Sequence, residues 1–61
     1  MKRDADMTET ELKARMGELG RRVSNGPRND DERQHWALTV RCYIAQIEFM
    51  AMEMERRAAA K

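Results

Sequence analysis

The stretch CYIAQIEFMAMEM, residues 42–54, decides the fold of this chain. Ten of its thirteen residues are apolar, and the three polar ones, Gln46, Glu48 and Glu53, do not share one side of a helix. A helix on the surface of a soluble protein needs only one apolar stripe. A helix that is apolar on two sides must therefore be covered on both.

The surrounding segment, residues 30–58, contains no glycine or proline and is predicted to form one long helix. At about 100° per residue its apolar side chains form two stripes. The first, called here the broad stripe, comprises Trp36, Val40, Tyr43, Ile47, Met50 and Met54, widened on one side by Ala37, Ile44, Ala51 and Ala58. The second lies nearly opposite and comprises Leu38, Cys42, Ala45, Phe49 and Met52. Polar strips separate the two stripes, with Arg41, Glu48 and Glu55 on one side and Thr39, Gln46 and Glu53 on the other.

A shorter helix is predicted for residues 8–24. Thr8 and Glu11 have the spacing of a capping box, in which each side chain bonds the backbone N–H of the other residue. One narrow apolar stripe follows, made of Leu12, Met16, Leu19 and Val23. This helix contains Gly17 and Gly20, each of which weakens it by up to about 1 kcal/mol relative to alanine.

Residues 24–29 are predicted to be a turn. Asn25 or Gly26 fits a left-handed cap, and Pro27 cannot continue the helical hydrogen bonds. Asn29 or Asp30 then caps the long helix. Residues 1–6 show no apolar periodicity and are expected to be frayed.

The fold prediction is an all-α helical hairpin forming a single domain over residues 1–61. The shorter helix can cover only one side of the long helix, so a second chain is expected on the other side. A twofold homodimer is the simplest closed solution, and two hairpins then make a four-helix bundle. The broad stripe either packs against the shorter helix or is wide enough to touch two helices at once.

Size and charge limit the functional classes. A chain of 61 residues buries only about 60% of its unfolded surface, and small domains usually need a disulfide, a metal or a partner. One cysteine cannot form an internal disulfide, and it fits a cytoplasmic protein. The net charge of +1 is unlike the strongly basic footprint of a dedicated nucleic-acid binder. No signal peptide is expected at the charged start, and no membrane span, because charges interrupt the apolar segment.

Neither a catalytic set nor a cofactor or metal site is predicted. His35 and Cys42 are about 10 Å apart along the helix, which is beyond hydrogen-bond reach for a nucleophile and its base. Cys42 lies in an apolar stripe and is expected to be a buried structural cysteine. Glu32 and His35 have a spacing found in carboxylate metal sites, but the apolar stripes supply no further carboxylates. The acidic start of the long helix is therefore interpreted as a solvated helix terminus.

These features predict a non-enzymatic, homodimeric protein-binding module that acts as an inhibitor, adaptor or regulator of another protein, a role that suits a phage or plasmid product. The expected oligomer or partner interface comprises Trp36, Val40, Tyr43, Ile47, Phe49, Met50, Met52 and Met54. A polar rim, able to contact phosphates, is expected from Arg21, Arg22, Arg28, Arg56 and Arg57. Two alternatives remain: a nucleic-acid-binding helical bundle that uses the arginine-rich ends, and a subunit that folds only in a hetero-complex.

Overall fold

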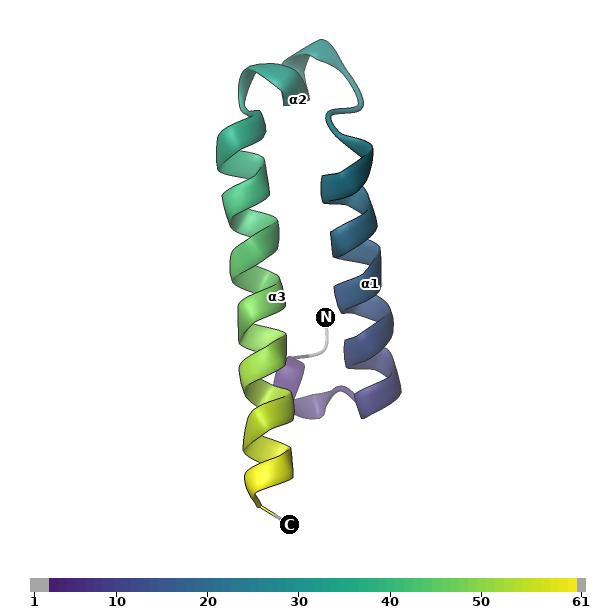
Figure 1. Ribbon diagram of the computed structural model, residues 1–61, viewed down its shortest axis with the longest axis vertical. Helices are drawn as coiled ribbons and strands as arrows, with labels where there is room; N and C mark the ends of the chain where they lie inside the picture. The colour runs from purple at the N-terminus through teal and green to yellow at the C-terminus, as the bar shows by residue number, and fades with distance from the viewer. Residues whose placement is uncertain (1–2, 61) are drawn as a thin grey trace.

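The computed structural model describes residues 3–60, which form an all-α hairpin as predicted. Its elements in chain order are the 3-10 helix η1 (Asp4–Asp6) and the α-helices α1 (Glu9–Asn25), α2 (Asp30–Gln34) and α3 (Trp36–Ala59). α1 and α3 lie antiparallel and side by side, with α2 at the turn between them (Figure 1). The molecule is a rod with principal extents of 45 × 21 × 16 Å. Within residues 3–60, no helix has both the length and the apolar character that crossing a bilayer requires.

The predicted capping box starts α1. Thr8 Oγ1 accepts a hydrogen bond from the Glu11 backbone N–H at 3.1 Å, and the Thr8 N–H donates to Glu11 Oε1 at 3.2 Å. Met7, the residue before the cap, packs against the core that contains Leu12. This is the arrangement of a hydrophobic staple, which sets the angle at which the chain enters a helix.

The turn of the hairpin depends on Gly26 and Asn29. Gly26 follows α1 with φ 80° and ψ −174°, a conformation that is essentially restricted to glycine. Asn29 caps α2 through its Oδ1, which accepts a hydrogen bond from the Glu32 N–H at 2.8 Å. The turn thus occupies the four residues between α1 and α2, close to the prediction of residues 24–29.

The prediction of one continuous helix over residues 30–58 is wrong at a single residue. His35 separates α2 from α3 with φ −118° and ψ 21°. Its N–H bonds Glu32 O at 3.2 Å, in the tight pattern of a 3-10 turn. Thr39 Oγ1 donates to His35 O at 3.0 Å, and such back-bonding bends helices. Because α2 buries no residue, no core contact holds it in line with α3.

The core lies between α1 and the broad stripe of α3. Only Leu12, Leu19 and Met50 are buried among the described residues. The partly buried apolar residues packed around them are Met7, Met16, Tyr43, Ile47 and Met54. The broad stripe therefore packs against α1, which the sequence had left open, and Leu12, Met16 and Leu19 of the predicted α1 stripe lie in this core.

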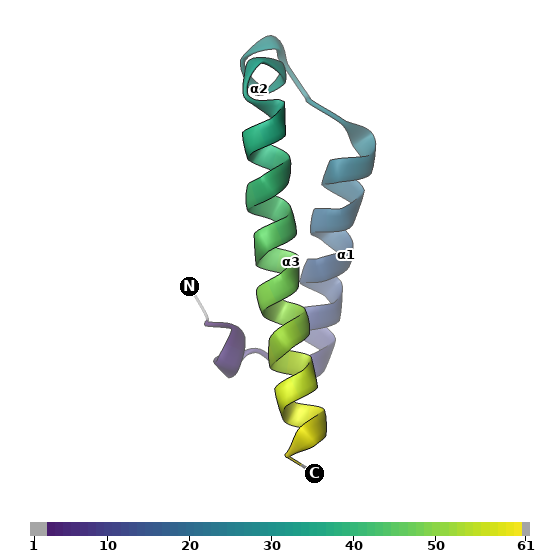
Figure 2. The same ribbon diagram turned by 60° about the vertical axis from the view of Figure 1, so that its left-hand side comes forward.

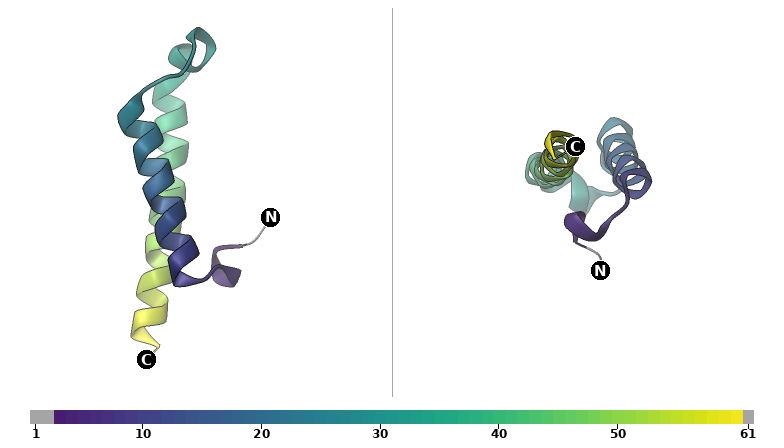
Figure 3. Two further views of the ribbon diagram at one scale, coloured as in Figure 1. Left: turned by 90° about the vertical axis from the view of Figure 1, so that its right-hand side faces the viewer. Right: turned by 90° about the horizontal axis from the view of Figure 1, so that it is seen from below.

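The chain before α1 differs from the expected frayed end. Residues 1 and 2 lie outside the described part, but Asp4–Asp6 form η1, which packs against α3. Its turn is closed by hydrogen bonds from the Asp6 N–H to Arg3 O at 2.9 Å and from the Met7 N–H to Asp4 O at 3.2 Å. η1 stands out sideways from the hairpin (Figure 2), and seen from below it lies on one side of the α1–α3 pair (Figure 3).

Alanine at the two glycines inside α1 should stabilise the protein. A Cβ at Gly20 would meet nothing within 4 Å, and one at Gly17 would come no closer than 3.8 Å to the Arg21 side chain. Each of G17A and G20A is expected to raise the free energy of unfolding by up to about 1 kcal/mol. Urea denaturation followed by circular dichroism at one protein concentration measures this change.

The control is G26A, because the backbone of Gly26 has positive φ and disfavours any Cβ. This variant should lower the free energy of unfolding by about 1–3 kcal/mol. Destabilisation by G20A would contradict the open space found around this residue.

Candidate interaction surface

Five apolar residues on α3 face away from α1 and form what we call the outer stripe. The outer stripe comprises Leu38, Cys42, Ala45, Phe49 and Met52. Leu38 and Phe49 are each 63% exposed and Met52 is 60% exposed. These three are among the largest apolar side chains of the protein, and no element of residues 3–60 covers them. The outer stripe is therefore the most prominent apolar surface of the isolated chain.

The structure divides the residues that the sequence assigned to an interface. Phe49 and Met52 lie on the outer stripe and are free to contact another molecule. Met50 is 3% exposed and belongs to the core. The others, which are partly buried on the side of the broad stripe, are Trp36, Val40, Tyr43, Ile47 and Met54. Interface contacts by this second group can involve only their exposed edges.

Cys42 was expected to be buried, but it is a free, exposed cysteine. Cys42 is exposed because α1 covers the broad stripe, whereas Cys42 lies on the outer stripe. His35 is also exposed and marks the break between α2 and α3. Nothing in the structure brings the thiol and the imidazole together.

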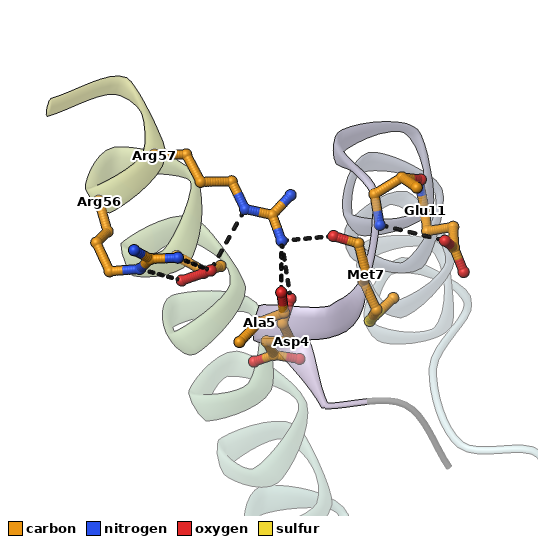
Figure 4. A network of polar contacts seen from close by, with 8 residues as sticks. Asp4, Ala5, Met7, Glu11, Arg56 and Arg57 are labelled. Carbon is orange, nitrogen blue, oxygen red and sulfur yellow. Dashed lines mark hydrogen bonds and ion pairs between the residues drawn. The ribbon is translucent and has the colours of Figure 1, made fainter. Parts of the chain in front are cut away.

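Arg57 joins the two ends of the described chain. Its Nη2 donates hydrogen bonds to the backbone carbonyl oxygens of Asp4, at 3.1 Å, Ala5, at 3.3 Å, and Met7 (Figure 4). These carbonyl groups belong to η1 and to Met7, the residue before the capping box. Arg57, predicted as part of a polar rim, thus holds η1 against the C-terminal half of α3.

Glu53 organises the arginines around this contact. It accepts hydrogen bonds from Arg56 Nη2 at 2.6 Å and Arg56 Nε at 2.8 Å, and from Arg57 Nε at 3.3 Å. Its side chain is only 9% exposed. The hydrogen bonds from Arg56 lower the pKa of Glu53 most; together with the charge of Arg56 and the hydrogen bond and charge of Arg57 they outweigh desolvation and lower this pKa to about 2. The carboxylate therefore stays ionised and keeps Arg57 oriented toward η1.

Two hollows share Phe49 in their linings, and η1 contributes residues to both. The larger, of about 540 Å³, is shallow and is lined by Asp4, Ala5, Phe49, Met52, Glu53 and Arg56. The other, of about 440 Å³, lies between η1, α1 and α3, with Met7 and Met50 among its lining residues. The Asp4 side chain borders both hollows. Phe49 and Asp4 therefore line both hollows.

Most of the arginines expected to form a polar rim already bind carboxylates of the same chain. Arg28 bonds Glu32 Oε2 through Nε at 3.2 Å and Nη2 at 3.1 Å. Arg22 bonds Glu18 at 3.2 Å, and Arg56 and Arg57 bond Glu53. In the described residues only Arg21 of the predicted set lacks an ion pair. The positive charge at both ends of the hairpin is thus largely neutralised.

Residues 3–60 contain no group of three histidine, cysteine, aspartate or glutamate side chains that could hold a metal ion. Comparison of the chain with protein-family models, with curated proteins and with solved structures gives no match. The functional interpretation therefore depends on the exposed surface and its charges.

Sequence reasoning missed η1 and Asp4 as parts of this surface. A signal was present, because Met7 stands immediately before the capping box, where an apolar residue indicates a hydrophobic staple. This signal predicts that Met7 packs against Leu12, at the edge of the core. The tether through Arg57 spans 50 residues or more and leaves no local pattern.

The ion pairs of Glu53 predict a pH dependence of stability. Because its pKa is lowered from 4.5 to about 2, ionised Glu53 stabilises the folded state above pH 4.5, and this contribution is lost as the pH falls toward 2. The E53Q variant should be less stable than the wild type at neutral pH, and the difference should shrink between pH 4.5 and 2. Thermal denaturation at a series of pH values measures this difference.

E55Q is the matched control, since Glu55 is exposed on the same helix and has no ion pair among the described residues. Its stability should follow the wild type across the whole pH range. An E53Q variant that keeps the pH dependence of the wild type would contradict the role given to Glu53.

Proposed function

We propose that this protein is a non-enzymatic protein-binding module that works as a homodimer and acts as an inhibitor, adaptor or regulator of another protein. Two hairpins join through their outer stripes and form a four-helix bundle. The observation that carries the proposal is the exposure of Leu38, Phe49 and Met52 along one line of α3. Isolated monomers rarely keep a contiguous apolar surface of this kind in water.

The free energy available from the outer stripe supports this proposal. Complete burial of one large apolar side chain contributes about 1.5–3 kcal/mol. The hairpin alone buries only three apolar residues among those described. Burial of Leu38, Phe49 and Met52 in an interface would double the number of buried large side chains per chain. Association therefore adds the stability that a core of this size lacks.

The accessible surface of the isolated chain also supports association. It amounts to 4940 Å², whereas a compact monomer of 7.2 kDa is expected to have about 4,100 Å². The excess of roughly 800 Å² equals the area that each partner buries in a protein–protein interface of standard size. One additional contact of ordinary size would thus bring the chain to the surface expected for its mass.

For the target protein, we propose the hollow between η1, α1 and α3 as the docking site. It has an apolar lining that includes Met7 and Met50, and a charged border that includes Asp4 and Arg15. Concave apolar sites with a few polar groups accept an anchoring side chain and orient it. The hollow shares Phe49 with the outer stripe, but its wall on the side of α1, which contains Met7, Glu11 and Arg15, is not part of the stripe.

The alternative of nucleic-acid binding has weaker support. Phosphate binding needs arginines that are free to replace counterions. Arg28, Arg56 and Arg57 instead bond glutamates of their own chain. No aromatic side chain lies among these arginines to stack on a base.

Substitution of Phe49 tests the homodimer directly. F49E places a charge in the centre of the proposed interface and should produce a folded or partly unfolded monomer of 7.2 kDa where the wild type has twice this mass. Gel filtration with light scattering measures the mass, and circular dichroism measures the helix content. A59E, which adds the same charge at an exposed site in the last turn of α3, should keep the mass of the wild type.

Three results would contradict the homodimer. A wild-type monomer with F49E unchanged in stability to within about 0.5 kcal/mol would show that Phe49 is an ordinary surface residue. A folded wild-type monomer that binds a different protein through Phe49 would make the outer stripe the target site itself. An unfolded wild-type chain would indicate a subunit that folds only with a different protein.

A charge reversal at the hollow tests the target site. D4K reverses the charge of a side chain that borders the hollow, while the Asp4 carbonyl that binds Arg57 is unchanged. Capture experiments with extracts of the source cells should yield a protein whose retention falls about tenfold with D4K, which corresponds to about 1.4 kcal/mol.

The matched control is D6K, which makes the same charge change in the same 3-10 helix at a residue that lines neither hollow. Retention by D6K should equal that of the wild type. Equal retention of every captured protein by D4K and D6K would rule out the hollow as the docking site.

A further inference from the structure

The charged residues beside the outer stripe indicate the orientation in which a second copy would pack on it. Arg41 and Glu48 are exposed on the same polar strip of α3, seven residues apart, and border the outer stripe on one side. Neither has an ion pair within residues 3–60. By contrast, Glu53, Arg56 and Arg57 of the same helix form a closed set of ion pairs. Arg41 and Glu48 are thus two opposite charges without partners at the edge of an uncovered apolar surface.

We propose that the occupant of the outer stripe is a second copy of this chain whose α3 runs antiparallel to the first, with Arg41 of each copy paired to Glu48 of the other. This inference rests on the proposed homodimer and adds its orientation and register. In a twofold contact, if residue i of one copy meets residue j of the other, then j of the first also meets i of the second. An axis perpendicular to α3 beside residues 43–45 therefore forms both ion pairs at once.

The parallel arrangement lacks this complementarity. An axis along α3 would instead place this polar strip against the strip of Thr39, Gln46 and Glu53 of the second copy, so that Arg41 faces the neutral Gln46 and Glu48 faces Glu53 in both halves of the contact. Like charges at facing edge positions of paired helices are unfavourable, and such charges set the orientation of helical pairs. The antiparallel arrangement converts two repulsions into two attractions without any change of residues.

The apolar residues of the outer stripe fit the same register. With the axis beside residues 43–45, Phe49 lies against Leu38 of the second copy, and Cys42 lies against Ala45 of the second copy. The small side chains are then central, where the two helices come closest, and the large ones fill both ends of the contact. On the opposite edge, Thr39 faces Gln46 of the second copy, so no charge is buried there. Apolar packing and charge pairing therefore select one register.

Charge reversals at these two residues test the orientation. R41E and E48R each replace both ion pairs by like-charge contacts, and each should raise the dissociation constant of the dimer about tenfold. The double variant R41E/E48R restores both pairs in reversed order and should return to within about twofold of the wild type. Sedimentation equilibrium measures the dissociation constants, and the exposed position of both residues keeps the hairpin itself intact.

E55R is the control for E48R. It makes the same change of charge on the same polar strip, but its residue lies beyond the proposed ion pairs, so the dissociation constant should stay within about twofold of the wild type. If R41E, E48R and E55R all leave the dissociation constant of the dimer unchanged, the antiparallel register is overturned while the homodimer stands. Weakening by E55R as strong as that by E48R would overturn the register. A wild type that stays monomeric at every concentration would overturn both the register and the homodimer.

Discussion

α3 carries apolar side chains on two opposite faces, and the rest of the hairpin can cover only one of them. α1 packs on the broad stripe and buries Met50 together with Leu12 and Leu19. It leaves Leu38, Phe49 and Met52 exposed on the other face. The core of the single hairpin is correspondingly small, with three buried residues among those described. A partner on the outer stripe would bury these exposed side chains, which is why oligomeric state is central to the function proposed for this protein.

The second organising contact lies at the opposite end of the hairpin from the turn. Glu53 orients Arg57, and Arg57 binds three backbone carbonyls of the segment before α1. This contact holds η1 beside Phe49 and thereby creates the walls of both hollows. Arg57, which the sequence analysis assigned to a polar rim, is thus also part of the scaffold. In this short chain, charged side chains at the surface thus stabilise the fold itself.

Much of the fold could be predicted because its signals are local. The capping box of Thr8 and Glu11, the cap at Asn29 and the two stripes of α3 each follow from residues a few positions apart. The break at His35 could not, because no helix-breaking residue marks it; in the structure it coincides with a hydrogen bond from Thr39 to His35 O and with the lack of buried residues in α2. The exposure of Cys42 and the tether of Arg57 depend on which face α1 covers and on contacts between distant segments. The sequence predicted the stripe that contains Phe49 and Met52, but it did not predict that Asp4 lines the hollows beside this stripe.

The measurement that tests the central claim most directly is the thermal melting midpoint of the wild-type chain over a hundredfold range of protein concentration. If two outer stripes close on each other, folding and association are coupled, and the midpoint must rise with concentration. A midpoint that is independent of concentration, for a chain that is folded at the lowest concentration, would show that the hairpin is stable with its outer stripe in water. That result would contradict the claim that α3 requires a partner on both faces.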